Sequence, residues 1–161
     1  MIRNATVEDA QAIGDIYNHY VLNSIITFEE TAVSIGEMRE RILSTTKKWP
    51  WIVFEIDGEI IGYAYASEWK SRCAYKHSLE STIYLDPKAG GKGIGTILYR
   101  DLLKRLEKLN IHAVIGGISL PNAASVALHE KLGFEKIGQF KEVGNKFNQW
   151  IDVGYWELLF K

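Results

Sequence analysis

The sequence predicts an α+β fold, in which a mixed central β-sheet is flanked by about four helices. Two observations lead to this class. The Asp57-Gly58 pair joins two apolar runs, as in a tight antiparallel hairpin. Further along the chain, amphipathic helical segments alternate with apolar strands, which is typical of strand–helix–strand crossovers. The expected order of elements is βααβββαβαββ, within one domain that covers residues 1–161.

The strands and helices are placed by the spacing of apolar residues and by helix caps. Thr6 and Ser34 precede the two N-terminal helices, and Ser34 with Glu37 has the Ser-x-x-Glu form of a capping box. Gly133 follows the last helix in the position of a C-cap glycine. The expected strands are residues 2–5, 51–56, 59–66, 77–85, 113–119, 135–143 and 149–159, and the expected helices are residues 10–21, 35–46, 94–109 and 123–132.

The composition is that of a globular domain rather than of a nucleic-acid-binding or membrane protein. The chain has 161 residues, of which 47% are hydrophobic and 24% charged, and its formal net charge is −1. This balance gives no positive field for nucleic acid or an anionic membrane, and no apolar run has the length of a membrane span. The single Cys73 excludes an internal disulfide. Because no signal-peptide pattern opens the chain, we expect a cytoplasmic protein.

The chain is organised around a glycine-rich turn between a strand and a long amphipathic helix. Gly90, Gly91, Gly93 and Gly95 fall close together there. Glycine tolerates backbone angles that let successive N–H groups converge, and a helix N-terminus favours an anion, so the turn is typical of a phosphate site. A flexible loop before an ordinary helix is the simpler alternative. A P-loop is excluded, because its lysine would be followed by Ser or Thr, whereas Lys92 is followed by glycine.

Two segments resemble the GNAT superfamily of N-acetyltransferases. Residues 90–95 are similar to its pyrophosphate loop, usually written Arg/Gln-x-x-Gly-x-Gly/Ala, and residues 122–134 are similar to its second coenzyme A helix. One departure is Gly90, which stands where the loop usually has Arg or Gln; the backbone donors remain, so we expect coenzyme A binding to survive. The resemblance narrows to the branch of phosphinothricin and methionine sulfoximine acetyltransferases through residues 18–20, 62–66, 72–75, 79–85, 143–144 and 152–156.

The resemblance implies acetyl-CoA as a co-substrate and no metal. It places the backbone of one strand beside the pantetheine arm, the glycine-rich turn around the pyrophosphate, and the later helix on the other side of the arm. A backbone N–H near Leu85 would stabilise the oxyanion. The cofactor-binding residues implied in this way are Ile83, Tyr84, Leu85, Gly90, Gly91, Lys92, Gly93, Ile94, Gly95, Thr96, Asn122 and Ser125.

Two side chains are candidates for proton transfer. Glu80 matches the family strand and is the expected general base, since burial would raise its pKa; an exposed strand carboxylate is the alternative. His129 stands where many members of the superfamily carry a tyrosine, and we expect it to protonate the leaving thiolate. A surface histidine is the alternative, and Tyr99 is another candidate donor. Asn122, Ser125 and His129, at i, i+3 and i+7, share one helix face.

The acceptor site is expected to come from two segments and to bind an acidic group. The Arg72 guanidinium matches the two oxygens of a carboxylate or phosphinate, with a solvated loop arginine as the alternative. Near the C-terminus, Trp150 and Tyr155 suggest, by the example of the family, a contact in a homodimer. The expected acceptor residues are Phe28, Glu29, Arg72, Cys73, Ala74 and Tyr75.

The sequence therefore predicts an acetyl-CoA-dependent N-acetyltransferase. The resemblance implies a small amino-acid-like substrate, such as phosphinothricin or methionine sulfoximine, and a role in detoxification. The alternatives are transfer to a polyamine, an aminoglycoside or a protein N-terminus, and a non-catalytic acyl-CoA-binding sensor. An acidic acceptor groove would favour the cationic acceptors, whereas Arg72 and Lys76 favour anionic ones.

Overall fold

The computed structural model describes residues 1–161 and has the expected order of strands and helices, so the predicted α+β fold is confirmed. The strands are β1 (Ile2–Asn4), β2 (Trp51–Ile56), β3 (Glu59–Glu68), β4 (Ser78–Leu85), β5 (Ala113–Leu120), β6 (Glu135–Lys146) and β7 (Gln149–Leu159). The α-helices are α1 (Ala10–Asn23), α2 (Ile35–Thr46), α3 (Ile94–Lys108) and α4 (Ala123–Lys131). Short 3-10 turns are η1 (Val7–Asp9), η2 (Cys73–Tyr75) and η3 (Pro87–Ala89).

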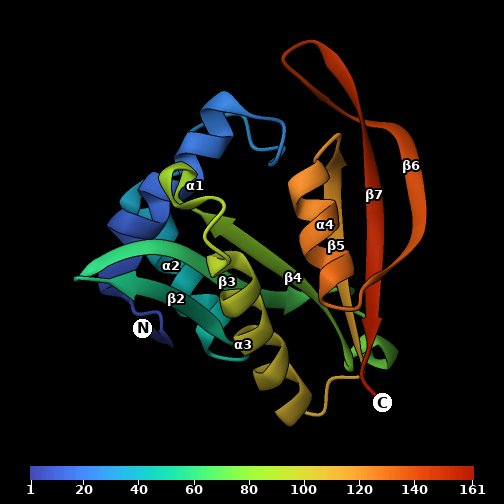
Figure 1. The fold of residues 1–161 in the computed structure, drawn as a ribbon, viewed down its shortest axis with the longest axis horizontal. Coiled ribbons are helices and arrows are strands. Elements are labelled where there is room, and N and C mark those ends of the chain that lie inside the picture. The colour runs from blue at the N-terminus through green and yellow to red at the C-terminus, as the bar shows by residue number, and fades with distance from the viewer.

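The strands form one mixed sheet in the order β1-β2-β3-β4-β5-β7-β6. All neighbours are antiparallel except β4 and β5, which run parallel. The β4–β5 ladder pairs only Ser78–Glu80 with Ala113–Ile115, although both strands continue beyond it. Figure 1 shows β4 leaning away from β5 after this point. The backbone of β4 after Glu80 therefore has no partner strand on the β5 side.

Helices cover both faces of the sheet. On the face of α1 and α2, Ile13, Ile42 and Val53 belong to one buried cluster. On the face of α3, Leu98 and Ile52 belong to a second cluster. Ile52 and Val53 are adjacent on β2, so their side chains point to opposite faces of the sheet. Figure 1 shows α3 in front of the first half of the sheet and α4 in front of β5 and β7. None of the helices combines the length and apolar character needed to cross a membrane.

The C-terminal hairpin departs from the prediction. β6 continues to Lys146, beyond the expected end at residue 143. It accommodates the extra length through a register shift between Phe140 and Gly144, as in a β-bulge. The Glu142 N–H, at a residue with positive φ, donates a hydrogen bond of 2.8 Å to Asp152 of β7. Phe147 and Asn148 form the turn, both with positive φ, so the type I′ geometry is reached here without glycine.

Candidate active site

A cavity of about 280 Å³ lies where β4 and β5 diverge. It brings together the predicted base, the predicted face of α4 and part of the predicted acceptor site. A larger and more open hollow, of about 700 Å³, lies beside α1 and the β2–β3 turn and contains none of the predicted site residues. The residues that line the smaller cavity are Ile26, Thr27, Phe28, Glu80, Ser81, Thr82, Ile83, Tyr84, Gly117, Ile118, Ser119, Asn122, Ser125, His129, Val153 and Tyr155.

Glu80 occupies the last paired position of β4 against β5, opposite Ile115. Its side chain is half-buried, and a carboxylate oxygen lies 3.7 Å from where a Cβ on Gly117 would be. Burial raises the pKa of Glu80 above its usual value, and the Lys70 ammonium opposes that shift. A carboxylate with a raised pKa in the wall of a cavity is suited to accept a proton near neutral pH.

A buried chain of hydrogen bonds runs from β4 through α3 to α4. The Ser81 hydroxyl lies 2.5 Å from the Tyr99 hydroxyl, which lies 3.1 Å from Nε2 of His129. On the other side of the ring, Nδ1 lies 2.7 Å from the carbonyl oxygen of Ser125. His129 is 4% exposed and Tyr99 is fully buried, which excludes the alternative of a surface histidine.

The partners of His129 decide where its proton lies. A carbonyl oxygen can only accept, so Nδ1 donates to Ser125, and Nε2 is left to accept from the Tyr99 hydroxyl. Burial lowers the pKa of His129, although the hydrogen bond to the Ser125 carbonyl opposes the shift. Burial also raises the pKa of Tyr99. The imidazole is therefore neutral near pH 7, with its single N–H already used.

The glycine-rich turn ends at the N-terminus of α3. Gly91 and Gly93 have φ angles of 79° and 74°, which side chains rarely adopt, and Gly93 is the N-cap of the helix. The first N–H groups of a helix lack intrahelical partners, so this end fits the pyrophosphate of a coenzyme. A Cβ on Gly95 would lie 3.3 Å from Leu85 and 3.4 Å from Leu128. This glycine therefore brings α3 close to both β4 and α4.

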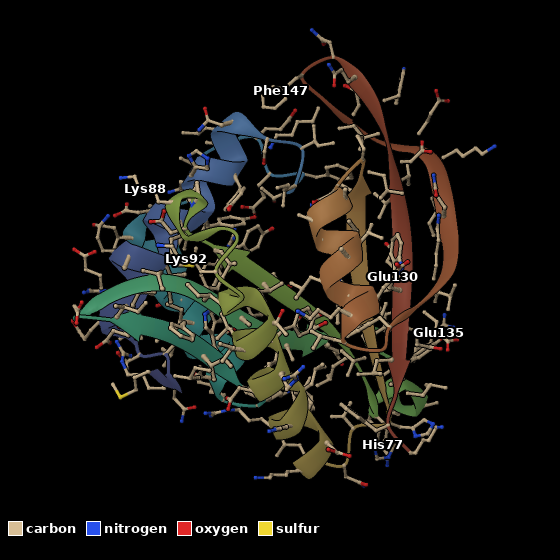
Figure 2. All side chains as sticks on the ribbon, viewed as in Figure 1. His77, Lys88, Lys92, Glu130, Glu135 and Phe147 are labelled. Carbon is tan, nitrogen blue, oxygen red and sulfur yellow. The ribbon has the colours of Figure 1, made fainter.

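Gly90 differs from the other glycines of the turn. Its φ is −61°, and the Pro87 carbonyl oxygen, at 4.0 Å, is the nearest atom to a Cβ built there. Because the position is also exposed, the fold would accept the Arg or Gln of the family motif. Figure 2 shows Lys92, the only charged side chain between Gly90 and Thr96, at the N-terminal end of α3.

The helix α4 presents Asn122, Ser125 and His129 to the cavity, which confirms that they share one helix face. Asn122 is the N-cap of α4, and its Oδ1 accepts a hydrogen bond of 3.1 Å from the Ser125 N–H. The amide nitrogen of Asn122 donates to no other group of the chain. It is therefore available as a donor at the wall of the cavity.

The structure brings only part of the predicted acceptor site to the cavity. Phe28 lines the cavity, whereas the Glu29 carboxylate pairs with the Arg41 guanidinium at 2.7 Å. The segment Arg72–Tyr75, which includes Cys73 and Ala74, forms η2 and its N-cap after a β3 that is longer than expected. All four residues are exposed, and none of them lines the cavity. No Lys or Arg side chain lines it either.

Two adjacent glycines of β5, which are not among the predicted site residues, shape the site. A Cβ on Gly116 would lie 2.6 Å from Nε2 of His129, and a Cβ on Gly117 would lie 3.2 Å from the Tyr155 ring. Their sequence signal is a Gly-Gly pair inside a β-branched strand, which marks a close approach of other atoms to the backbone. Tyr155, expected at a dimer contact, lines the cavity, while Trp150 is 68% exposed.

Known proteins resemble this chain over nearly its whole length. Residues 2–154 match the family model described as an acetyltransferase (GNAT) domain. The chain is 38% identical to a phosphinothricin N-acetyltransferase of Streptomyces viridochromogenes, over 99% of this chain and 87% of the relative. It is 33% identical to an L-methionine sulfoximine/L-methionine sulfone acetyltransferase of Pseudomonas paraeruginosa, over 98% of this chain and 92% of the relative.

A solved structure agrees with the fold as well as with the sequence. The crystal structure of a GNAT superfamily phosphinothricin acetyltransferase from Sinorhizobium meliloti, in complex with acetyl-CoA, matches with a TM-score of 0.95 and 38% identity. The match covers 99% of this chain and 87% of that chain. The chain belongs to the GNAT acetyltransferase family.

Proposed function

We propose that this acetyl-CoA-dependent N-acetyltransferase acts on the amine of a small amino-acid-like substrate, of the phosphinothricin or methionine sulfoximine type. The observation that carries the proposal is the position of Glu80. It is the only carboxylate that lines the small cavity, its pKa is raised, and it lies on the strand that leads into the glycine-rich turn. The names of the relatives supply the substrate class.

The donor acetyl-CoA supplies a thioester carbonyl for attack by the amine. We assign its pyrophosphate to the N–H groups from Gly91 to Thr96, because this helix end has donors without intrahelical partners. The backbone of residues 83–85, unpaired on the β5 side, would bind the pantetheine arm as it would an added strand. Tyr20 of α1 supports that strand end, since its hydroxyl donates a hydrogen bond of 2.5 Å to the Leu85 carbonyl.

Glu80 is the proposed general base. An ammonium cannot attack a carbonyl until it has lost a proton, and Glu80 takes this proton directly or through water. A C–N bond then forms, the C–S bond breaks, and the new amide nitrogen loses its second proton to solvent. Glu80 has then gained one proton and the leaving thiolate needs one. The raised pKa of Glu80 supports this role, because it brings the proton affinity of the carboxylate closer to that of an amine.

The proton for the thiolate has three candidate sources. Tyr99 is a poor donor, because burial raises its pKa above that of an ordinary thiol. The neutral ring of His129 has no free N–H, so it could donate only from its charged form, and a lowered pKa makes that form scarce at pH 7. We therefore assign the proton to solvent. His129 then acts by orienting the buried Tyr99 hydroxyl, which in turn hydrogen-bonds to Ser81 at the cavity wall.

One observation favours a second class of acceptor. Because no Lys or Arg lines the cavity, a substrate carboxylate or phosphinate has to find a partner elsewhere, such as the exposed Arg72. An amine without an acidic group, such as a polyamine, needs only Glu80. The volume of about 280 Å³ lies at the low end for small-molecule sites, which favours small acceptors over aminoglycosides.

Release of free thiol from acetyl-CoA tests the proposal. The panel contains amino acids, their sulfone, sulfoximine and phosphinate analogues, and polyamines. We expect release with the amino-acid analogues. Release with polyamines alone would move the assignment to the second class, and coenzyme A binding without release from any acceptor would favour the non-catalytic sensor.

The proposal includes a homodimer. The C-terminal hairpin exposes several large apolar side chains, including Trp150 at 68%, Phe140 at 60% and Phe147 at 54%, which suits a protein contact. Analytical ultracentrifugation measures this directly, and a monomer at every concentration would contradict it. The cytoplasmic location and the role in detoxification stay predictions.

A further inference from the structure

A buried lysine from the C-terminal hairpin reaches the loop that follows α1. Lys146, at the end of β6, is 1% exposed. Its ammonium donates hydrogen bonds to the carbonyl oxygens of Val21, at 2.7 Å, and Thr27, at 2.8 Å. Val21 lies in the last turn of α1, and Thr27 lines the active-site cavity. One side chain of the hairpin therefore joins the end of a helix to a wall of the site.

Hydrogen bonds and nearby charges stabilise the buried ammonium of Lys146. A buried charge needs hydrogen bonds to offset its desolvation. Burial lowers the pKa of Lys146, and the Glu30 carboxylate opposes the shift. The carbonyl end of α1 favours a cation, and the Phe147 ring lies 5.1 Å from the ammonium. Loss of the ammonium would leave two buried carbonyl oxygens without this donor.

The hairpin touches the same wall at a second place. A Cβ on Gly144 would overlap the ring of Phe28, so this ring packs directly against the backbone of β6. On the opposite side, the Thr27 hydroxyl lies 2.9 Å from the Tyr17 hydroxyl of α1. Figure 1 shows the tip of the hairpin reaching over α4 toward this loop, and Figure 2 labels Phe147 at that tip. The wall is thus held between the hairpin and α1.

We propose that Lys146 is a positioning residue for the acceptor substrate. By holding Thr27 and Phe28 at the cavity, it sets how tightly the acceptor amine is bound in front of Glu80. The proposal rests on the proposed function, since it concerns a wall of the same site. The groups assigned to the donor lie on β4, the glycine-rich turn, α3 and α4, and Lys146 hydrogen-bonds to none of them. Its loss should therefore affect the acceptor and not acetyl-CoA.

Steady-state kinetics of Lys146→Met test this separation, because methionine keeps an unbranched apolar stem and removes the ammonium. The KM for the acceptor should rise about tenfold, as expected for lost hydrogen bonds to a charged group. The KM for acetyl-CoA and kcat should each change less than about threefold. Lys146→Arg, which keeps the donors, should recover most of the acceptor affinity. Lys141→Met is the matched control, because Lys141 is exposed on the same strand, and it should change none of these constants.

A second variant and a second measurement keep the test decisive. Gly144→Ala should raise the acceptor KM by displacing Phe28, and it replaces Lys146→Met if that protein does not fold. Hydrogen–deuterium exchange of residues 24–30, without substrate, should be faster in Lys146→Met than in Lys141→Met. This measurement tests whether Lys146 holds residues 24–30 in place, even if no acceptor is acetylated. A lack of acetylation would contradict only the proposed function. Unchanged exchange, an unchanged acceptor KM, or an equal rise in both KM values would overturn the proposal.

Discussion

Replacing Gly116 by alanine should destabilise the protein by displacing the His129 ring. The new methyl carbon would lie 2.6 Å from Nε2, whereas an ordinary contact begins at 3.4 Å, so the ring or the strand must move by about 0.8 Å. The ring is held on several sides. Its Nδ1 donates to the Ser125 carbonyl at 2.7 Å, and its centroid lies 5.1 Å from that of Tyr99 and 5.0 Å from that of Phe134.

The magnitude follows from three contributions. Overpacking a filled core costs about 1–3 kcal/mol. Loss of the Tyr99–His129 hydrogen bond leaves buried polar atoms unpaired, at about 1–3 kcal/mol. Alanine restricts the unfolded chain more than glycine does, which offsets about 0.5 kcal/mol. The free energy of unfolding should therefore fall by about 1.5–5.5 kcal/mol, a large part of the 5–15 kcal/mol typical of a domain.

Urea unfolding followed by tryptophan fluorescence measures this change. Gly117→Ala is the matched control for stability, because its Cβ would meet the edge of Tyr155 at 3.2 Å and the Glu80 carboxylate at 3.7 Å, and not the His129 ring. We expect it to impair activity while the free energy of unfolding falls by less than about 1 kcal/mol. A Gly116→Ala protein within about 0.5 kcal/mol of wild type would contradict this prediction, because the His129 ring would then move without cost.

Three further predictions concern the base, the histidine and the glycine-rich turn. In wild type, kcat/KM should rise with pH through the raised pKa of Glu80 and then level off. Glu80→Gln should lower kcat/KM about 100-fold and abolish this rise. Wild-type rates in the variant from about pH 6 to 9 would exclude Glu80 as the base. The pKa of His129 is lowered in the folded state, so as the pH falls below 6.5 the unfolded chain takes up that proton first. The free energy of unfolding should therefore decrease as the pH falls from about 6.5 through the lowered pKa of His129 in the folded protein. Urea titrations of His129→Gln at the same pH values should lack this contribution to the decrease. Gly90→Arg should fold normally, because the position is open, and should bind coenzyme A about three- to tenfold more tightly, because the guanidinium can pair with phosphate. Calorimetry measures this affinity, and weaker binding would show that position 90 does not face the coenzyme.

Local features of the fold could be predicted because they depend on near neighbours. Ser34 caps α2 as expected, with its hydroxyl oxygen accepting from the Glu37 N–H at 3.1 Å. Asp57 and Gly58 make the predicted tight turn, with positive φ at both residues. The point at which β4 and β5 separate has no such signal. It depends on how two strands pack that are remote in the sequence, so the position of the cavity could not be derived from spacing alone.

Some residues of the candidate site could likewise be predicted from the sequence, and others could not. The face of α4 followed from helical periodicity, and Glu80 followed from a motif on one strand. The segment Arg72–Tyr75 was assigned to the acceptor by resemblance, and the path of the loop after β3 leaves it outside the cavity. Lys146 looks like an exposed residue before a turn. Its burial depends on the end of α1, 125 residues earlier in the chain, which no local pattern reports.

The alternation of side chains along β4 agrees with the proposal that this one strand contacts both substrates. Tyr84 points to the face of α1, where its ring lies 5.3 Å from that of Tyr17, and Glu80 shares that face by the two-residue period. Ser81 points to the opposite face and bonds to Tyr99 of α3. Between the two rows runs a backbone edge that β5 leaves unpaired. In the proposed function, acceptor chemistry on one face meets donor binding along this edge because the β4–β5 ladder stops at Glu80. Had the ladder continued, β5 would fill the edge assigned to the donor.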